Sequence, residues 1–212
     1  MRRLIVAALL LGASVAEAAP PTVDELLNRI DASAVSIDTL SGEFVQRNRL
    51  KLFKQELHSE GRLLSHRPRQ IRWEYLRPDP STLILDDKLA TLSTPGGEAQ
   101  TFDLERDPTM RIVFDQLLVW LGTGPKDKDK LAADYTLATV EQKGQPTLIL
   151  TPLPTSTVSK VFSRIELRLD AKTSLLRSLL LIERAGDEKE IVFQKLLKNA
   201  KLPGDAFARA KR

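Results

Sequence analysis

Residues able to carry out covalent chemistry are few in this chain of 212 residues. The two histidines are His58 and His66, and cysteine is absent. Neither histidine has another ligand at metal-binding spacing, and the sequence holds no H-E-x-x-H, G-x-S-x-G or P-loop motif. Acidic residues are scattered and mostly alternate with basic ones, so no carboxylate pair is marked for acid–base catalysis. We therefore predict no catalytic residues, no metal site and no cofactor, and a protein that is not an enzyme.

The most informative stretch is residues 67–78, where two prolines bracket a short alternating run. Ile71, Trp73 and Tyr75 fall on one face of this run and Arg72 on the other, which predicts a half-buried strand. Proline is tolerated at strand ends because it cannot donate to the ladder there. The aromatic face has two explanations at this point: the wall of a lipid-binding cavity, or an ordinary sheet core.

The N-terminus predicts export from the cytoplasm. Basic residues at positions 2 and 3 precede an apolar run over residues 4–15 and an A-x-A site at 16–18. These are the parts of a secretory signal peptide, so we expect residues 1–18 to be removed after Ala18 and residues 19–212 to form one exported mature domain. Without cysteine there is no disulfide and no acylated cysteine anchor, so we expect a soluble protein stabilised by its hydrophobic core.

The charge balance argues against nucleic acid as a partner. The chain has 32 basic and 28 acidic residues, a formal net charge of +4. Its basic clusters, at residues 126–130 and 209–212, are most simply solvated surface, although transient attraction to anionic lipid headgroups stays open. The interleaving of both signs gives no basic stripe of the kind that follows a phosphate backbone.

Hydrophobic periodicity predicts a single domain of many strands with two helices. The first helix should run from Val23 to about Ala34, because Thr22 and Glu25 form a capping box before an apolar stripe. Short turns join the strands without βαβ crossovers, which favours an antiparallel sheet. Strands are expected at about residues 40–47, 56–64, 71–76, 82–85, 89–92, 99–104, 135–140, 147–150, 161–169, 175–184 and 190–196.

The second predicted helix covers residues 107–121 and ends at Gly122, before a polar loop at residues 124–130. It is apolar nearly all round, so it must be covered on both sides, either as a buried core helix or between the sheet and another apolar body. Its apolar stripe includes Met110, Val113, Phe114 and Leu117.

Several motifs, taken in order, resemble the LolA family of periplasmic outer-membrane lipoprotein carriers. They are the F-x-Q of residues 44–46, Gly61, the R-P and R-W-E-Y of residues 67–75, the L-x-L-x-P of residues 148–152, and the I-V-F of residues 191–193 followed by Asn199 and a Leu-Pro pair. The match covers nearly the whole mature chain. Departures such as the missing glycine after Asp86, Ile71 where the family often has an aromatic, and the extra Trp120 in the second predicted helix indicate a divergent member.

The resemblance implies an α+β domain: a curved, open antiparallel half-barrel covered by a helical lid, with an apolar cavity between them. The same resemblance aligns Arg67 with a family arginine that holds the lid closed by hydrogen bonds, and a guanidinium can bridge several carbonyls. The residues expected to line the cavity are Phe44, Leu63, Ile71, Trp73, Tyr75, Met110, Val113, Phe114 and Leu117.

By the same resemblance, the expected function is that of a monomeric carrier in the periplasm of a Gram-negative bacterium. It would take the acyl chains of lipoproteins from an inner-membrane release complex to an outer-membrane acceptor. Two alternatives stay open: a protein of the same fold that binds another lipid, such as a glycolipid or polyketide-type cargo, and an envelope sensor or structural protein that uses the sheet to bind a partner. A hydrolase would require a reactive group that the sequence does not offer.

Overall fold

The computed structural model describes residues 20–52, 55–86, 88–107, 111 and 128–209. Within them lie two α-helices, α1 (Val23–Val35) and α3 (Lys128–Asp134), and a short 3₁₀ helix η1 (Thr157–Lys160). The strands are β1 (Thr39–Arg49), β2 (Glu56–His66), β3 (Gln70–Arg77), β4 (Ser81–Leu85), β5 (Leu89–Ser93), β6 (Gln100–Asp103), β7 (Tyr135–Gln142), β8 (Gln145–Pro152), β9 (Phe162–Leu169), β10 (Leu176–Glu183) and β11 (Glu188–Lys198).

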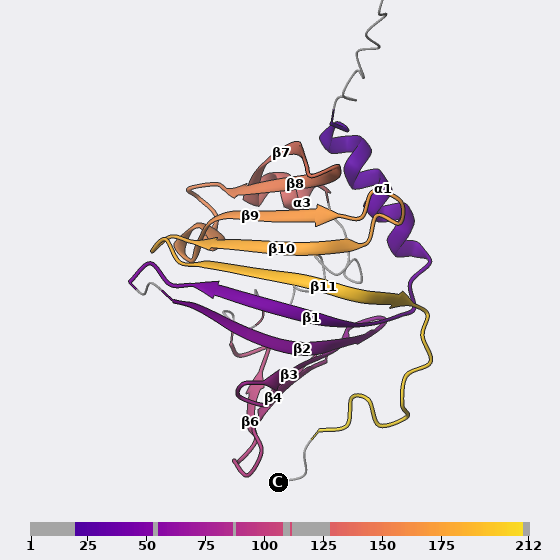
Figure 1. Ribbon diagram of the computed structural model, residues 1–212, viewed down its shortest axis with the longest axis vertical. Helices are drawn as coiled ribbons and strands as arrows, with labels where there is room; N and C mark the ends of the chain where they lie inside the picture. The colour runs from indigo at the N-terminus through magenta and orange to yellow at the C-terminus, as the bar shows by residue number, and fades with distance from the viewer. Residues whose placement is uncertain (1–19, 53–54, 87, 108–110, 112–127, 210–212) are drawn as a thin grey trace, which may run out of the picture.

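All eleven strands form one open sheet, in the order β6-β5-β4-β3-β2-β1-β11-β10-β9-β8-β7. Every neighbouring pair is antiparallel, which confirms the prediction of an antiparallel sheet. The first and last strands of the chain, β1 and β11, meet in the middle of the sheet. Figure 1 shows β8 to β2 crossing the view nearly side by side, whereas β4 and β6 run steeply, so the sheet is strongly twisted.

The register sorts the side chains into two unlike faces. One, which we call the apolar face, carries rows of buried hydrophobic side chains that follow the pairing from strand to strand, such as Leu85, Ile71 and Leu40. The opposite, charged face carries arginine or glutamate at half of the alternate positions of β1 to β3. The alternation predicted for residues 71–76 is therefore confirmed.

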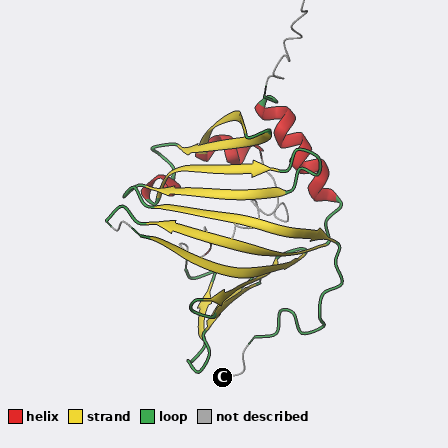
Figure 2. Cartoon of the chain, in the orientation of Figure 1, coloured by secondary structure: helices red, strands yellow, loops and turns green. Residues whose placement is uncertain are grey.

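Helix α1 begins as predicted. The Thr22 hydroxyl accepts from the Glu25 backbone N–H, and the Thr22 N–H donates to the Glu25 carboxylate at 2.8 Å. The backbone hydrogen bond from Thr22 lowers the pKa of Glu25, as expected for a carboxylate held at a helix N-terminus. The helix runs along one end of the strands β7 to β10 (Figure 2). Its Leu26 and Leu27 belong to the hydrophobic core.

The described residues contain less helix than the predicted helical lid requires. Helix α1 has 13 residues and α3 has seven. Of the predicted helix at 107–121 the structure describes only Asp107 and Arg111, and the Arg111 N–H donates to the Asp107 carbonyl at 3.0 Å, as in a helical turn. The rest of that prediction lies outside the described residues. Among the described helices, none has the length and hydropathy needed to cross a bilayer.

The predicted polar loop at 124–130 is wrong in its last residues, because α3 already begins at Lys128. The charged residues there continue into Leu131, Ala132 and Ala133, and the alanines and leucine are strong helix formers. The half-buried Leu131 packs against the core, and this contact favours a helix over a solvated loop.

Two tight turns follow their sequence signals. Lys143 and Gly144 both have positive φ and join Gln142 to Gln145, which makes a two-residue hairpin turn. Between β4 and β5, the Asp86 carboxylate accepts from the backbone N–H groups of Lys88 and Leu89. Aspartate thus stabilises that turn without the glycine that the family pattern leads one to expect.

After β11 the chain descends toward the C-terminus on the side of the view where β3 to β6 lie (Figure 1). The Arg72 guanidinium donates to the Ala206 carbonyl at 3.3 Å, and Arg209 pairs with Asp86. The rings of Phe207 and His66 lie 6.4 Å apart. The contacts with Arg72 and His66 lie on the charged face.

Gly61 of β2 sits where two larger groups pass close by. A Cβ at this position would lie 2.2 Å from the Glu74 carbonyl oxygen and 2.3 Å from Phe44 Cζ. The missing side chain lets the Phe44 ring lie across β2 toward β3.

We predict that Gly61→Ala lowers the free energy of unfolding by about 1–3 kcal/mol through overpacking. Urea denaturation measures this change. Gly204→Ala is the matched control, because a Cβ there meets nothing within 4 Å, and it should change stability by less than about 0.5 kcal/mol. Equal effects of the two substitutions would contradict the close approach at Gly61.

Candidate functional site

Four aromatic side chains gather at the centre of the apolar face: Phe44 of β1, Trp73 and Tyr75 of β3, and Phe193 of β11. The ring centroids of Phe44 and Trp73 lie 4.4 Å apart, and Phe44 meets Tyr75 edge-on at 5.5 Å. Trp73 meets Phe193 edge-on at 6.1 Å. This aromatic cluster spans four adjacent strands, because Gly61 of β2 leaves room for it.

The described cavity residues of the prediction lie together on this face. Leu63 and Ile71 are 0% exposed, and their strands pair so that Leu63 lies opposite Trp73. Phe44 and Trp73 are also buried, whereas Tyr75 is only partly so. The remaining predicted members, Met110, Val113, Phe114 and Leu117, lie outside the described residues.

Arg67, the predicted lid latch, connects the strands to a helix. Its guanidinium Nη2 donates to the carbonyl of Ala34 in the last turn of α1 at 2.7 Å. Its backbone N–H donates to the Asp38 carbonyl at 2.9 Å. A cation at a helix C-terminus is favourable, because the last carbonyls have no partner within the helix. Arg67 therefore ties the end of α1 to the turn between β2 and β3.

A row of polar side chains crosses the apolar face beside the aromatic cluster, and the sequence prediction missed it. The Tyr75 hydroxyl donates to Gln46 Oε1 at 2.7 Å, and Gln46 Nε2 donates to Asn48 Oδ1 at 3.0 Å. Gln46 is 5% exposed, so these bonds supply the partners that a buried amide needs. The signal was present, since the F-x-Q alternation places Gln46 on the same face as Phe44.

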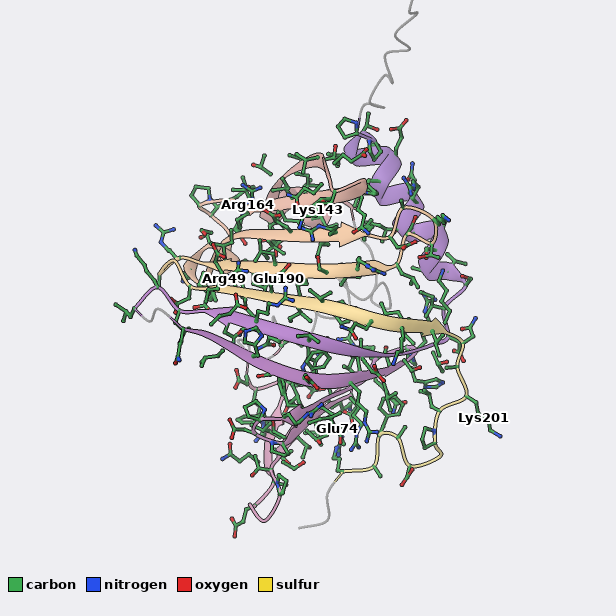
Figure 3. All side chains as sticks on the ribbon, in the orientation of Figure 1. Arg49, Glu74, Lys143, Arg164, Glu190 and Lys201 are labelled. Atoms are coloured by element: carbon green, nitrogen blue, oxygen red, sulfur yellow. The ribbon has the colours of Figure 1, made fainter. Side chains whose placement is uncertain are left out.

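Several ion pairs connect neighbouring strands on the charged face. Arg49 bridges Glu56 of β2 at 2.6 Å and Glu188 of β11 at 3.1 Å, while Glu74 pairs with Arg62 and Arg72. Partial burial works to raise the pKa of Glu74, but hydrogen bonds from Arg62 and Arg72 outweigh it and lower that pKa. Figure 3 labels Glu74 on β3, with Arg49 and Glu190 toward one end of β1 and β11. Such pairs favour exposure of this face to water.

The two histidines lie on the charged face at opposite ends of β2, roughly 26 Å apart at about 3.3 Å per residue. His58 Nε2 lies 3.1 Å from Glu56, and His66 Nδ1 lies 3.1 Å from Gln70. Within the described ranges, no three His, Cys, Asp or Glu side chains come together as a metal site would need. The arrangement that the sheet does build is suited to binding apolar groups.

The sequence matches the family described as outer membrane lipoprotein carrier protein LolA over residues 35–210. No curated protein matches it. Low identity to the solved structures that it resembles is consistent with a divergent member of that family.

Three solved structures show the same fold. A chain in the MucA/MucB complex of Pseudomonas aeruginosa has a TM-score of 0.54 and 20% identity, covering 88% of this chain and 60% of that one. MucB alone has a TM-score of 0.50 and 21% identity, covering 88% and 62%. An uncharacterized conserved protein from Thermus thermophilus has a TM-score of 0.54 and 12% identity, covering 89% and 94%. This chain thus spans about 60% of the length of the MucA/MucB chain that it matches.

The two tyrosines of the chain, Tyr75 and Tyr135, provide a test of the buried face. Burial raises the pKa of Tyr75, and burial together with the nearby Asp134 raises the pKa of Tyr135. In the folded protein we therefore predict no phenolate absorbance step at the ordinary pKa of about 10, whereas the urea-unfolded chain should show both.

These raised pKa values make the folded protein less stable at high pH. The native state holds both phenolic protons more tightly than the unfolded chain, so the contribution is fully present below pH ~10 and is lost as pH rises above it. An absorbance titration with a normal tyrosine step in the folded state would contradict the burial of that ring.

Proposed function

Because this chain belongs to the LolA family of outer membrane lipoprotein carrier proteins, we propose that it is a periplasmic carrier that binds the acyl chains of lipoproteins against the apolar face and moves them from the inner to the outer membrane. The observation that carries the proposal is the apolar face itself, with the aromatic cluster at its centre. Removal of residues 1–18 as a signal peptide belongs to the same proposal, since it delivers the chain to the periplasm.

The physical need for such a carrier is large. Each methylene of an acyl chain costs about 0.8 kcal/mol in water, so a chain of about sixteen carbons costs on the order of 10 kcal/mol. A lipoprotein cannot cross an aqueous compartment with its chains exposed. An extended apolar surface backed by a charged face meets this need, because one side covers the chains while the other keeps the carrier in water.

The carrier must also hide this surface when it is empty. Leu63, Ile71 and Phe44 are each no more than 1% exposed in the structure, so cargo has to replace whatever covers them. Exchange of one apolar cover for another has a small net free energy, which allows both loading and release. The Arg67 hydrogen bond to α1 is placed to favour the covered state, in line with the role of lid latch.

The proposal includes partners. A release complex at the inner membrane and an acceptor at the outer membrane would hand cargo on, and contact with membrane surfaces would be transient. Two other functions on the same fold make different demands: a carrier of another lipid needs the apolar face but no lipoprotein, and an envelope sensor needs a protein partner and no lipid.

Native mass spectrometry of the protein purified from its own cell envelope separates these functions. We expect a complex with acylated lipoprotein. Recovery of a lipid without protein would favour the carrier of another lipid, and a protein partner without acyl chains would overturn the proposal in favour of a sensor.

Trp73→Ala should weaken binding of an acylated lipoprotein at least about tenfold, or about 1.4 kcal/mol, because it removes a ring from the aromatic cluster. Titration with fluorescently labelled lipoprotein in detergent below its micelle concentration measures this. Ile84→Ala is the matched control: Ile84 is buried on the opposite, charged face, opposite Arg72 in the pairing of β3 and β4. If Ile84→Ala weakens binding as much as Trp73→Ala does, the aromatic cluster is only core.

Arg67→Leu should slow release of cargo about tenfold. A hydrogen bond to a charged group contributes about 1.5–3 kcal/mol, and its loss destabilises the empty, covered state relative to the loaded one. The rate of transfer from the loaded variant to acceptor membranes measures release. The release rate of Arg69→Leu, a substitution two residues away at the same turn, serves as the comparison. Faster release from Arg67→Leu would contradict the role of Arg67 as a latch.

A further inference from the structure

Ser65 of β2 is a hydroxyl set into the apolar face. In the sheet it lies between Ile71 of β3 and Leu40 of β1, which are 0% and 1% exposed. Ser65 itself is 0% exposed. Side chains on one strand face alternate with those on the other, so Ser65 shares its face with Gly61 and Leu63 and not with Arg62 or His66.

The Ser65 hydroxyl has no hydrogen-bond partner within the described part of the chain. A hydroxyl buried among hydrocarbon without a partner is unfavourable, and folded proteins rarely leave one so. Alanine or valine would fill the same place at no such cost. The partner of this hydroxyl therefore has to come from outside the described part of the chain.

A second buried donor nearby also has no hydrogen-bond partner among the described residues. Arg67 follows two residues later, and its Nη2 is bonded to α1, but its Nε is buried and has no partner among the described residues. The polar row of Gln46, Tyr75 and Asn48 is different, because those side chains bond to one another. Unused donors are thus found at the α1 end of the face, while the polar groups of that row are paired.

The ligand that fits these donors has an acceptor oxygen among hydrocarbon. An acyl chain ends in a carbonyl, whether it is joined as an ester or as an amide, and a carbonyl oxygen accepts from O–H and N–H donors. We infer that Ser65 donates a hydrogen bond to the acyl carbonyl of bound cargo, so that the face selects acyl chains over plain alkyl chains and holds the carbonyl near the α1 end. This inference rests on the proposed function and adds to it a specificity-determining residue.

The direction of binding follows from this placement. With its carbonyl at Ser65, a chain would extend across β2 and β3 over Leu63 and Trp73 toward Tyr75. The polar head of the cargo would then lie near Arg67 and the end of α1, where the latch is. Cargo with a carbonyl would therefore lie next to the hydrogen bond between Arg67 and α1.

The test uses a matched pair of lipids and the full mature protein. Dipalmitoylglycerol has ester carbonyls, and dihexadecylglycerol is its ether analogue without them. Isothermal titration calorimetry should show that the wild-type protein binds the ester about threefold to tenfold more tightly, the range expected for one neutral hydrogen bond. Ser65→Ala should bind both lipids equally, with its affinity for the ether unchanged within about twofold.

Stability in the absence of lipid provides a second readout. Because Ser65→Ala removes an unpaired buried hydroxyl, its urea midpoint should stay the same or rise. A fall in stability together with weaker binding of both lipids would overturn the inference and make Ser65 a packing residue. Ser178→Ala is the matched control, since Ser178 is 4% exposed and opposes Val192 and Arg168 on the other face, and it should keep the preference for the ester.

The remaining outcomes separate this inference from the proposed function. A wild-type protein that binds ester and ether equally well would overturn the role of Ser65 and leave the carrier function intact. A wild-type protein that binds neither lipid, nor an acylated lipoprotein, would overturn both.

Discussion

The contact on which this structure depends is the passage of Phe44 across Gly61. The ring of Phe44 reaches over β2 because Gly61 has no side chain, and there it meets Trp73 and Tyr75 of the next strand but one. Aromatic pairs of this kind add about 0.5–1.5 kcal/mol each beyond the area that they bury. The contact joins β1, at the centre of the sheet, to β3, where the sheet turns steeply, and it makes a continuous aromatic surface out of separate strands.

The two faces of the sheet have different roles in the proposed carrier function. Ion pairs such as those of Arg49 with Glu56 and Glu188 contribute little to stability individually, but they keep the charged face compatible with water. Covering the apolar face lowers the free energy of the protein, whether its own side chains or cargo supply the cover. Polar groups on that face are unfavourable unless they are hydrogen-bonded. Gln46 has a partner in Tyr75 and is part of the folded structure, whereas Ser65 has none among the described residues and is the proposed contact for a ligand.

Much of the architecture could be predicted from local pattern. Alternation at residues 71–76 correctly separated the aromatic face from the charged one, and the T-x-x-E capping box marked the start of α1, because both signals depend on neighbours in the chain. Register could not be predicted, since the pairing of Phe44 with Gly61 brings together residues of different strands. The start of α3 at Lys128 was missed because the charges looked like a loop, while packing of Leu131 decided for a helix. Ser65 was missed for the same reason as the register: its lack of a partner is a property of the folded sheet and not of its own strand.

The central claim is that acyl chains lie against the apolar face, and photochemical labelling tests it most directly. A palmitoyl lipid with a diazirine in mid-chain would be bound, irradiated, and the labelled peptides identified by mass spectrometry. The account predicts label on β1 and β3 around Phe44 and Trp73, suppressed by excess unlabelled lipid. Label confined to the charged face, for example around Arg49 and Glu190, or label that excess lipid does not suppress, would contradict it.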